Sequence, residues 1–307
     1  MAGENDTVEA GADDHPDKPR IGWAAPAVAV AVAIGAVWLI LFLQARYHWG
    51  SETYYNYGWA VPFLGLFLLY QRLKTGVVLG PPDRGYAVAA CILGAGLLLL
   101  VPLLRLFNEA NPFWRVPLWG MAVAIYFGTL LITLGWGGPG LVRKCAFPFF
   151  FFLLALPWPY RVETGIIQIL TQKVTWATVQ ALHLIGHPAE ALGNTIRVGD
   201  ARIGVNEACS GIRSLQALGM VSLFMGEYFR LKVGRRVALV ALALVFVLFF
   251  NLIRAIVLSL VTLDDPSAFD AWHDRTGMVT FVGSIVCLFL AGEILDRTGG
   301  GAAGAEA

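Results

Sequence analysis

Long apolar runs separated by short polar segments dominate the pattern of the chain. About 20 apolar residues make a helix long enough to cross the hydrocarbon core of a membrane. The first run extends from Ala24 to Leu43, and seven more follow at 59–71, 86–107, 117–136, 141–157, 208–226, 237–258 and 276–295. The second and fifth runs are short or broken by Pro62 and Pro148. The pattern predicts an all-α fold, a polytopic membrane bundle of about eight transmembrane helices within residues 21–297.

The two ends of the chain lack this pattern. Residues 1–20 are acidic and rich in Gly, Asp and Pro, which predicts a disordered tail. An acidic start also differs from the basic beginning of a cleavable signal peptide. Residues 298–307 are mostly Gly and Ala, and this low complexity predicts a second disordered tail.

Two further segments predict elements that do not cross the membrane. The segment Val162 to Ile185 is fairly apolar but carries Glu163, Gln168, Gln172, Lys173, Gln180 and His183. This mixture favours an amphipathic helix that lies in the membrane interface. Two β-branched runs flank Gly199 and Asp200 within residues 195–205, which predicts a small β-hairpin. The hairpin is interpreted either as a plain connector or as a lid or docking edge for a substrate.

The basic residues predict the orientation of the bundle. With a cytoplasmic N-terminus, the inner segments hold Lys18, Arg20, Arg72, Lys74, Arg84, Arg143, Lys144, Arg230, Lys232, Arg235, Arg236 and Arg297. The short outer loops hold only Arg46, Arg105, Arg115 and Arg275. Twelve against four agrees with the positive-inside rule. Both termini are therefore expected in the cytoplasm, and the 162–185 helix and the hairpin on the outer side of the cytoplasmic (inner) membrane.

Composition supports a membrane protein and argues against nucleic-acid binding. Hydrophobic residues make up 57% of the chain and charged residues 14%, whereas soluble domains average about 25% charge. The basic residues occupy short loops and form no continuous stripe, so nucleic acid is excluded as a partner.

One short polar stretch, Asn206-Glu207-Ala208-Cys209-Ser210-Gly211-Ile212-Arg213, opens the sixth apolar run at its predicted outer end. A helix start and a nearby cation both lower the pKa of a thiol and favour the thiolate nucleophile. The Ser-Gly pair lets a substrate backbone approach closely. The alternative interpretation is a turn that merely opens a helix, with Cys209 as a small inert side chain.

Two later residues are predicted to share this depth and side. Arg254 lies about four residues before the outer end of the seventh run, roughly 6 Å below it. Asn251 is three residues earlier, so both polar groups lie on one helical face. His273 stands in an exposed linker before the eighth run and is a candidate general acid or base. For Arg254 alone, an interfacial anchor is the simpler alternative.

These residues also carry a resemblance. Ala208-Cys209-Ser210-Gly211-Ile212-Arg213-Ser214, Asn251-x-x-Arg254 and His273-x-x-x-Gly277 in an eight-span chain resemble the exosortase/archaeosortase family. Residues 58–63, Gly-Trp-Ala-Val-Pro-Phe, are similar to that family's first hairpin. The resemblance covers most of residues 24–295, and the cysteine motif is its most specific part.

The resemblance implies a membrane cysteine peptidase or transpeptidase. Members process exported surface proteins whose C-terminal tail carries a short recognition motif, a transmembrane helix and a basic cluster. Cys209 would be the nucleophile of a thioester intermediate, Arg254 the oxyanion stabiliser and His273 the general acid/base. Asn206, Glu207, Ser210, Gly211, Arg213 and Asn251 would support them. The acceptor would be an amine or water, membrane lipid the surroundings, and neither a cofactor nor a metal is implied.

Two other classes of function fit the sequence less well. A transporter or channel could use Arg254 and Asn251 as a polar path, but the sequence shows no inverted repeat or paired broken helices. A thiol oxidoreductase needs two cysteines within disulfide reach, and Cys91, Cys145 and Cys287 are expected to lie away from Cys209. A metal site is not favoured either, because His183-x-x-x-His187 has Leu184 where a metalloprotease helix carries Glu.

Overall fold

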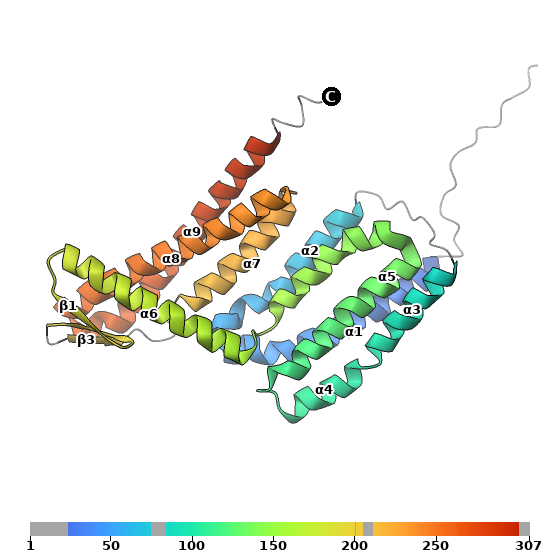
Figure 1. Cartoon of the computed structure of the whole chain (residues 1–307), viewed down its shortest axis with the longest axis horizontal. Coiled ribbons are helices and arrows are strands. Elements are labelled where there is room, and N and C mark those ends of the chain that lie inside the picture. Colours follow the sequence, from blue (N-terminus) through green and yellow to red (C-terminus); the bar gives the residue numbers. More distant parts are fainter. Residues whose placement is uncertain (1–23, 75–83, 200, 205–210, 301–307) are drawn as a thin grey trace, which may run out of the picture. The chain divides into compact units, whose positions relative to one another are not determined.

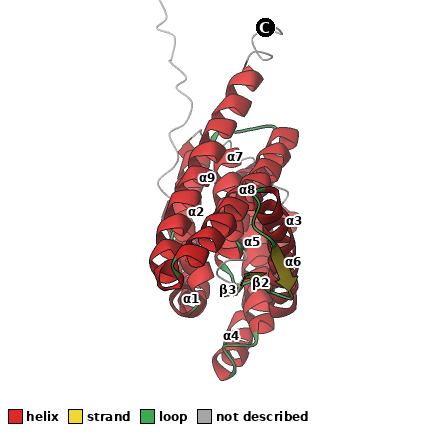
Figure 2. Ribbon diagram, turned by 90° about the vertical axis from the view of Figure 1, so that its left-hand side faces the viewer, coloured by secondary structure: helices red, strands yellow, loops and turns green. Residues whose placement is uncertain are grey.

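The computed structural model describes residues 24–74, 84–199, 201–204 and 211–300. Almost all of this described part is helical, and a small β-sheet is the exception (Figures 1 and 2). The predicted all-α membrane class is therefore confirmed. The chain divides into two compact units between Ile40 and Leu41, within α1 (Ala24–Ser51). The second of these two units, Leu41–Ala307, contains all the residues of the two pockets and of the ionic network described below.

Within the described residues, five helical stretches are long and apolar enough to cross a membrane: Ala27–Ser51, Arg84–Ala110, Arg115–Ala155, Val233–Asp264 and Pro266–Thr298. The predicted second and sixth spans form shorter helices, α2 (Val61–Lys74) and α7 (Ile212–Tyr228). The predicted third span is divided into α3 (Arg84–Leu98) and α4 (Val101–Ala110), with Pro102 at the start of α4. Each predicted span that is described is helical, so the helix count is close to the expected eight.

The predicted fourth and fifth spans are the two arms of α5 (Arg115–Phe152). Gly138 interrupts this helix with φ 67° and ψ −170°, a conformation that is essentially restricted to glycine. The Tyr126 hydroxyl donates a 3.4 Å hydrogen bond to the Ala146 carbonyl. Residues 20 apart in a straight helix are separated by about 30 Å. The bond therefore shows that the chain folds back at Gly138 and that α5 is a helical hairpin.

The predicted amphipathic segment forms α6 (Tyr160–Leu184), which runs across α7 and α8 (Val233–Asp264) in Figure 1. It is not among the helices with the length and apolarity of a span. The hairpin is also present: β2 (Thr195–Val198) pairs antiparallel with β3 (Ala201–Gly204). A third strand, β1 (Ala189–Leu192), pairs with the other edge of β2. His183 lies in the last turn of α6, and its Nε2 is 2.7 Å from the Ala189 carbonyl oxygen, so its ring joins α6 to β1.

The C-terminal helices form a hairpin that carries the site. Asp264 ends α8, the 3-10 turn η5 (Pro266–Ala268) follows, and α9 (Phe269–Gly300) returns along α8. The Asp265 side chain caps the turn by accepting a 2.9 Å hydrogen bond from the Ser267 amide. Helix α7 packs against both partners through a buried cluster that contains Leu218, Met225, Leu231, Leu239, Ala243, Val247 and Leu288. Helix α9 begins at residue 269 and ends at residue 300. Residues 298–300, which the sequence assigned to the disordered tail, are therefore helical.

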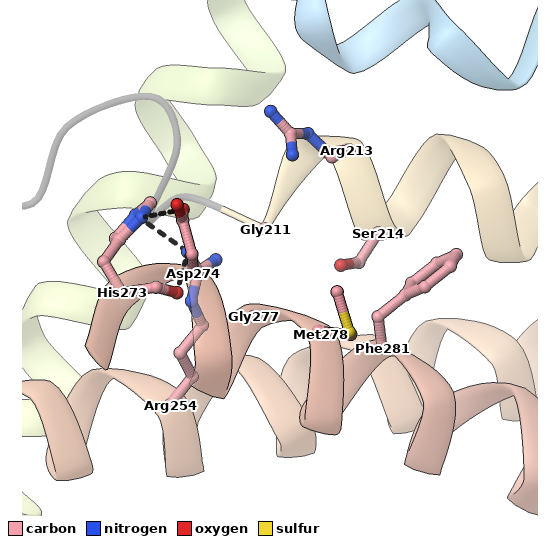
Figure 3. A pocket seen from close by; sticks show the side chains of 9 residues that line it. All are labelled: Gly211, Arg213, Ser214, Arg254, His273, Asp274, Gly277, Met278 and Phe281. Carbon is pink, nitrogen blue, oxygen red and sulfur yellow. Dashed lines mark hydrogen bonds and ion pairs between the residues drawn. The ribbon is translucent and has the colours of Figure 1, made fainter. Parts of the chain in front are cut away.

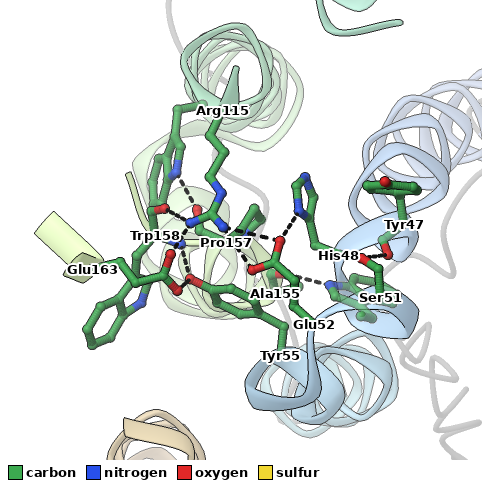
Figure 4. A network of polar contacts seen from close by, with 12 residues as sticks. Tyr47, His48, Ser51, Glu52, Tyr55, Arg115, Ala155, Pro157, Trp158 and Glu163 are labelled. Atoms are coloured by element: carbon green, nitrogen blue, oxygen red, sulfur yellow. Dashed lines mark hydrogen bonds and ion pairs between the residues drawn. The ribbon is translucent and has the colours of Figure 1, made fainter. Parts of the chain in front are cut away.

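A buried ionic network joins the ends of α1, α5 and α6 (Figure 4). Arg115, which is 8% exposed, contacts Glu163, the Trp158 carbonyl and both carboxylate oxygens of Glu52. Tyr55 in η2 (Thr53–Trp59) donates a 2.5 Å hydrogen bond to Glu163. Burial disfavours the charged form of Glu52, but the hydrogen bond with His48 and the charge of Arg115 outweigh this and lower its pKa. Glu163 is thus buried, although the sequence placed it among the polar positions of an interfacial helix.

This network also supports the beginning of α7. The turn η2 packs against α7, and the side chains of Tyr54 and Trp158 pack around Ile212, which is only 1% exposed. Ile212 is the first residue of α7. The network therefore holds the segments that fix the start of α7, where the candidate site lies.

Candidate active site

Arg254 and His273 form the polar centre of the site. Arg254 extends from α8, and its Nη2 lies 2.7 Å from Nε2 of His273 on α9 (Figure 3). A guanidinium is always charged and can only donate hydrogen bonds. In this contact Arg254 can therefore only be the donor, and Nε2 of His273 is the acceptor. The other ring nitrogen, Nδ1, lies 3.4 Å from Oδ1 of Asp274.

Two glycines bring the neighbouring backbones close to the Asn251-x-x-Arg254 pair. A Cβ added to Gly277 would lie 3.3 Å from Cζ of Arg254, so the guanidinium rests on the backbone of α9. A Cβ added to Gly211 would lie 3.0 Å from Cγ of Asn251. Gly211 also has φ 83° at the start of α7, a left-handed conformation that glycine adopts most easily. The spacing of three residues in α8 thus places one polar group against α7 and the next against α9.

A cavity of about 450 Å³ opens between α7, α8 and α9. Its lining residues are Gly211, Arg213, Ser214, Arg254, His273, Asp274, Gly277, Met278 and Phe281. Figure 3 shows Arg254 and His273 at one end and Met278 and Phe281 at the other, so the cavity has a polar end and an apolar end. The guanidinium of Arg213 points away from that of Arg254 in the same view.

The structure brings together four of the predicted site residues and places a fifth beside them. Gly211, Arg213, Arg254 and His273 line the cavity, and Asn251 is buried against Gly211. Cys209 lies outside the described residues, as do Asn206, Glu207 and Ser210. The remaining cysteines Cys91, Cys145 and Cys287 are free thiols on α3, α5 and α9 and are not among the lining residues.

Two details differ from the sequence-based expectation. His273 is not in a linker: it lies in the first turns of α9, because η5 and its Asp265 cap start the helix before the apolar run begins. Arg254 is ten residues from the end of α8 rather than about four, because the helix continues past the apolar residues to Asp264. The lining residues Met278 and Phe281 were not predicted, since a Met and a Phe in an apolar span carry no signal that separates them from lipid-facing neighbours.

The comparison with protein families identifies the family of the chain. The model of the transmembrane exosortase family matches residues 49–290, more than three quarters of the chain. The chain belongs to the transmembrane exosortase family. Exosortases are membrane cysteine transpeptidases that act on proteins carrying a sorting signal, and the matched region includes the whole cavity lining. No curated protein and no solved structure matches the chain.

Proposed function

We propose that this exosortase cleaves the C-terminal sorting signal of exported proteins through a thioester on Cys209, at the outer face of the cytoplasmic membrane. The Arg254–His273 pair beside the start of α7 is the observation that carries the proposal. Cys209 precedes Gly211 by two residues, and two peptide units span at most about 7 Å. The chain itself therefore tethers the thiol to a residue that lines the cavity.

Each step of the proposed reaction uses one member of this set. The Cys209 sulfur attacks the scissile carbonyl carbon, a C–S bond forms, and the carbonyl oxygen becomes an oxyanion. Arg254 donates to the oxyanion, as backbone amides do in other proteases. When the substrate binds, the guanidinium turns from His273 to the scissile carbonyl oxygen, so that Nε2 accepts the thiol proton as the C–S bond forms.

Collapse of the tetrahedral intermediate completes the cleavage. The C–N bond breaks, and His273 transfers its proton to the departing amine of the membrane tail. An acceptor amine, or water, then attacks the thioester and releases Cys209. Asn251 and Gly211 keep the start of α7 close to Arg254, and Asn206, Glu207, Ser210 and Arg213 flank the thiol in the sequence.

A reporter protein with a C-terminal sorting signal tests the proposal in cells. Cys209→Ala should abolish tail removal. Arg254→Lys should slow it by roughly 100- to 1,000-fold, the usual effect of losing an oxyanion contact, because an ammonium lacks the planar fork of donors. His273→Ala should also stop turnover while the protein still inserts. Arg275→Lys, an exposed position on the same helix outside the lining, is the matched control.

The outcomes separate the proposal from transport. Processing that continues in Cys209→Ala would remove the thiol from the mechanism. A phenotype that survives Cys209→Ala but not Arg254→Ala would favour a polar transport path instead. Near-normal rates in His273→Ala would leave His273 without a role in proton transfer.

A further inference from the structure

A second polar pocket lies at the other end of α7. It has a volume of about 250 Å³ and is lined by Leu68, Gln71, Arg72, Glu227, Tyr228 and Arg230. Helix α7 has 17 residues and is therefore about 25 Å long, close to the thickness of the hydrocarbon core. The two pockets thus lie at opposite ends of a helix with the length of that core.

Among the described residues at this second pocket, positive charges outnumber negative ones. Glu227 is 3% exposed, and its two carboxylate oxygens pair with Arg72 and with Arg236, the latter at 2.6 Å. One buried carboxylate is thereby shared by two guanidiniums. Arg230 adds a third guanidinium at the pocket, and no hydrogen bond or ion pair of its side chain occurs in the described part of the chain. A pocket with this excess of guanidinium groups over carboxylates favours an anionic ligand.

The backbone at Arg230 strengthens this argument. Arg230 has φ 52°, which makes it the one non-glycine residue with positive φ in the described part of the chain. The Leu231 amide donates to the Gly226 carbonyl and the Arg230 amide to the Glu227 carbonyl, a Schellman ending of α7. Glycine is the usual residue at this left-handed position. An arginine there is conformationally unfavourable, so its presence indicates a use for the side chain.

An aromatic surface continues from the pocket. The ring of Tyr228 stacks on those of Phe67 and Phe224, with centroids 6.1 and 6.0 Å apart, and the Phe67 and Phe224 rings are tilted against each other. Tyr228 is 51% exposed and Phe67 38% exposed. A ligand that fills the pocket with a phosphate can therefore lay an acyl chain along these rings. This combination fits a phospholipid better than a free anion.

We propose that this pocket, on the cytoplasmic side, binds the phosphate of an anionic diacyl phospholipid through Arg230 and Arg72, with one acyl chain against Tyr228 and Phe67. Basic pockets between transmembrane helices commonly hold such headgroups. The binding site is separate from the cavity at Arg254, and the proposal holds whatever reaction occurs there.

Native mass spectrometry of the full-length protein in detergent tests the site with phosphatidylglycerol and phosphatidylcholine as probes. The wild type should bind phosphatidylglycerol several-fold more tightly than phosphatidylcholine. Arg230→Gly should weaken phosphatidylglycerol binding roughly fivefold or more. The same substitution should leave the melting temperature unchanged or raise it, because glycine suits the left-handed position. Arg230→Lys should retain most of the affinity.

Arg235→Ala is the matched control, since it removes an equal charge from the same end of the molecule outside the pocket lining. It should change the affinity less than twofold. Unchanged phosphatidylglycerol binding in Arg230→Gly, or an equal loss in Arg235→Ala, would overturn the proposal. Displacement of the lipid by millimolar inorganic phosphate would show that the pocket recognises a free anion, which would also overturn it.

Discussion

At the scale of single residues, the site depends on how closely backbone and side chains approach one another. The Asn251-x-x-Arg254 spacing predicted that two polar groups share one face of α8, and the structure adds what each group touches. The convergence of Arg254 and His273 could be predicted from their depth in the apolar runs. Their direct hydrogen bond could not, because it depends on the backbone of α9 at Gly277 lying beside the guanidinium.

Gly277→Ala tests this close approach. The new Cβ would lie 3.3 Å from Cζ and Nη2 of Arg254, so the guanidinium must shift by a few tenths of an ångström or more. Small displacements of a catalytic group reduce rates strongly, up to about 100-fold for 1 Å. We expect processing of the reporter to slow by roughly tenfold or more, with no loss of thermal stability, because alanine is the better helix former.

The control for this substitution is Gly219→Ala on α7. Gly219 is also helical, and a Cβ there would meet nothing within 4 Å. Gly219→Ala should therefore process the reporter at the wild-type rate. Equal rates in Gly277→Ala and Gly219→Ala would show that the position of the guanidinium tolerates displacement, which conflicts with the role proposed for Arg254.

At the scale of elements, local composition predicted some features and tertiary pairing created others. The two spans within α5 could be separated in the sequence because Gly137, Gly138, Pro139 and Gly140 interrupt the apolar run. Strand β1 could not be predicted, since Ala-Glu-Ala-Leu has no β-branched residue and becomes a strand by pairing with β2. The burial of Glu163 was missed for the same kind of reason: its partner Arg115 is 48 residues away.

The Arg115 network gives a test at this scale. Glu163 is only 1% exposed, and Glu163→Gln removes the negative charge of its carboxylate. Of the two ion pairs described for Arg115, the one with Glu52 then remains. Breaking a buried ion pair on one side typically costs about 3–5 kcal/mol. We expect a clear fall in the melting temperature of the purified protein, and reduced processing because η2 and α6 support Ile212 at the start of α7.

Glu190→Gln is the matched control for this effect. Glu190 pairs with Arg197 on the sheet, and both side chains are largely exposed. The substitution should therefore lower the free energy of unfolding by no more than about 1 kcal/mol. A melting temperature in Glu163→Gln as high as in Glu190→Gln would show that the network contributes nothing to stability.

At the scale of the whole molecule, the proposed reaction and the proposed lipid site require opposite sides of the membrane. Helix α8 has 32 residues, about 48 Å at 1.5 Å per residue, so it is longer than the hydrocarbon core and both ends can reach water. Lys232 is exposed just before α8, and the Asp274 side chain is 93% exposed near the start of α9. The positive-inside rule predicts that Lys232 lies inside and Asp274 outside.

Cysteine labelling in intact cells measures this arrangement directly. In a Cys209→Ser background, Asp274→Cys should react with a membrane-impermeant maleimide added outside, because the residue lies beside the cavity where an exported substrate must arrive. Lys232→Cys should react only after the membrane is permeabilised. The unsubstituted Cys209→Ser protein accounts for labelling of Cys91, Cys145 and Cys287. Labelling of both positions from outside, or of Lys232→Cys alone, would put the Arg254–His273 pair on the wrong side of the membrane for an exported substrate, and the proposed function would have to be abandoned.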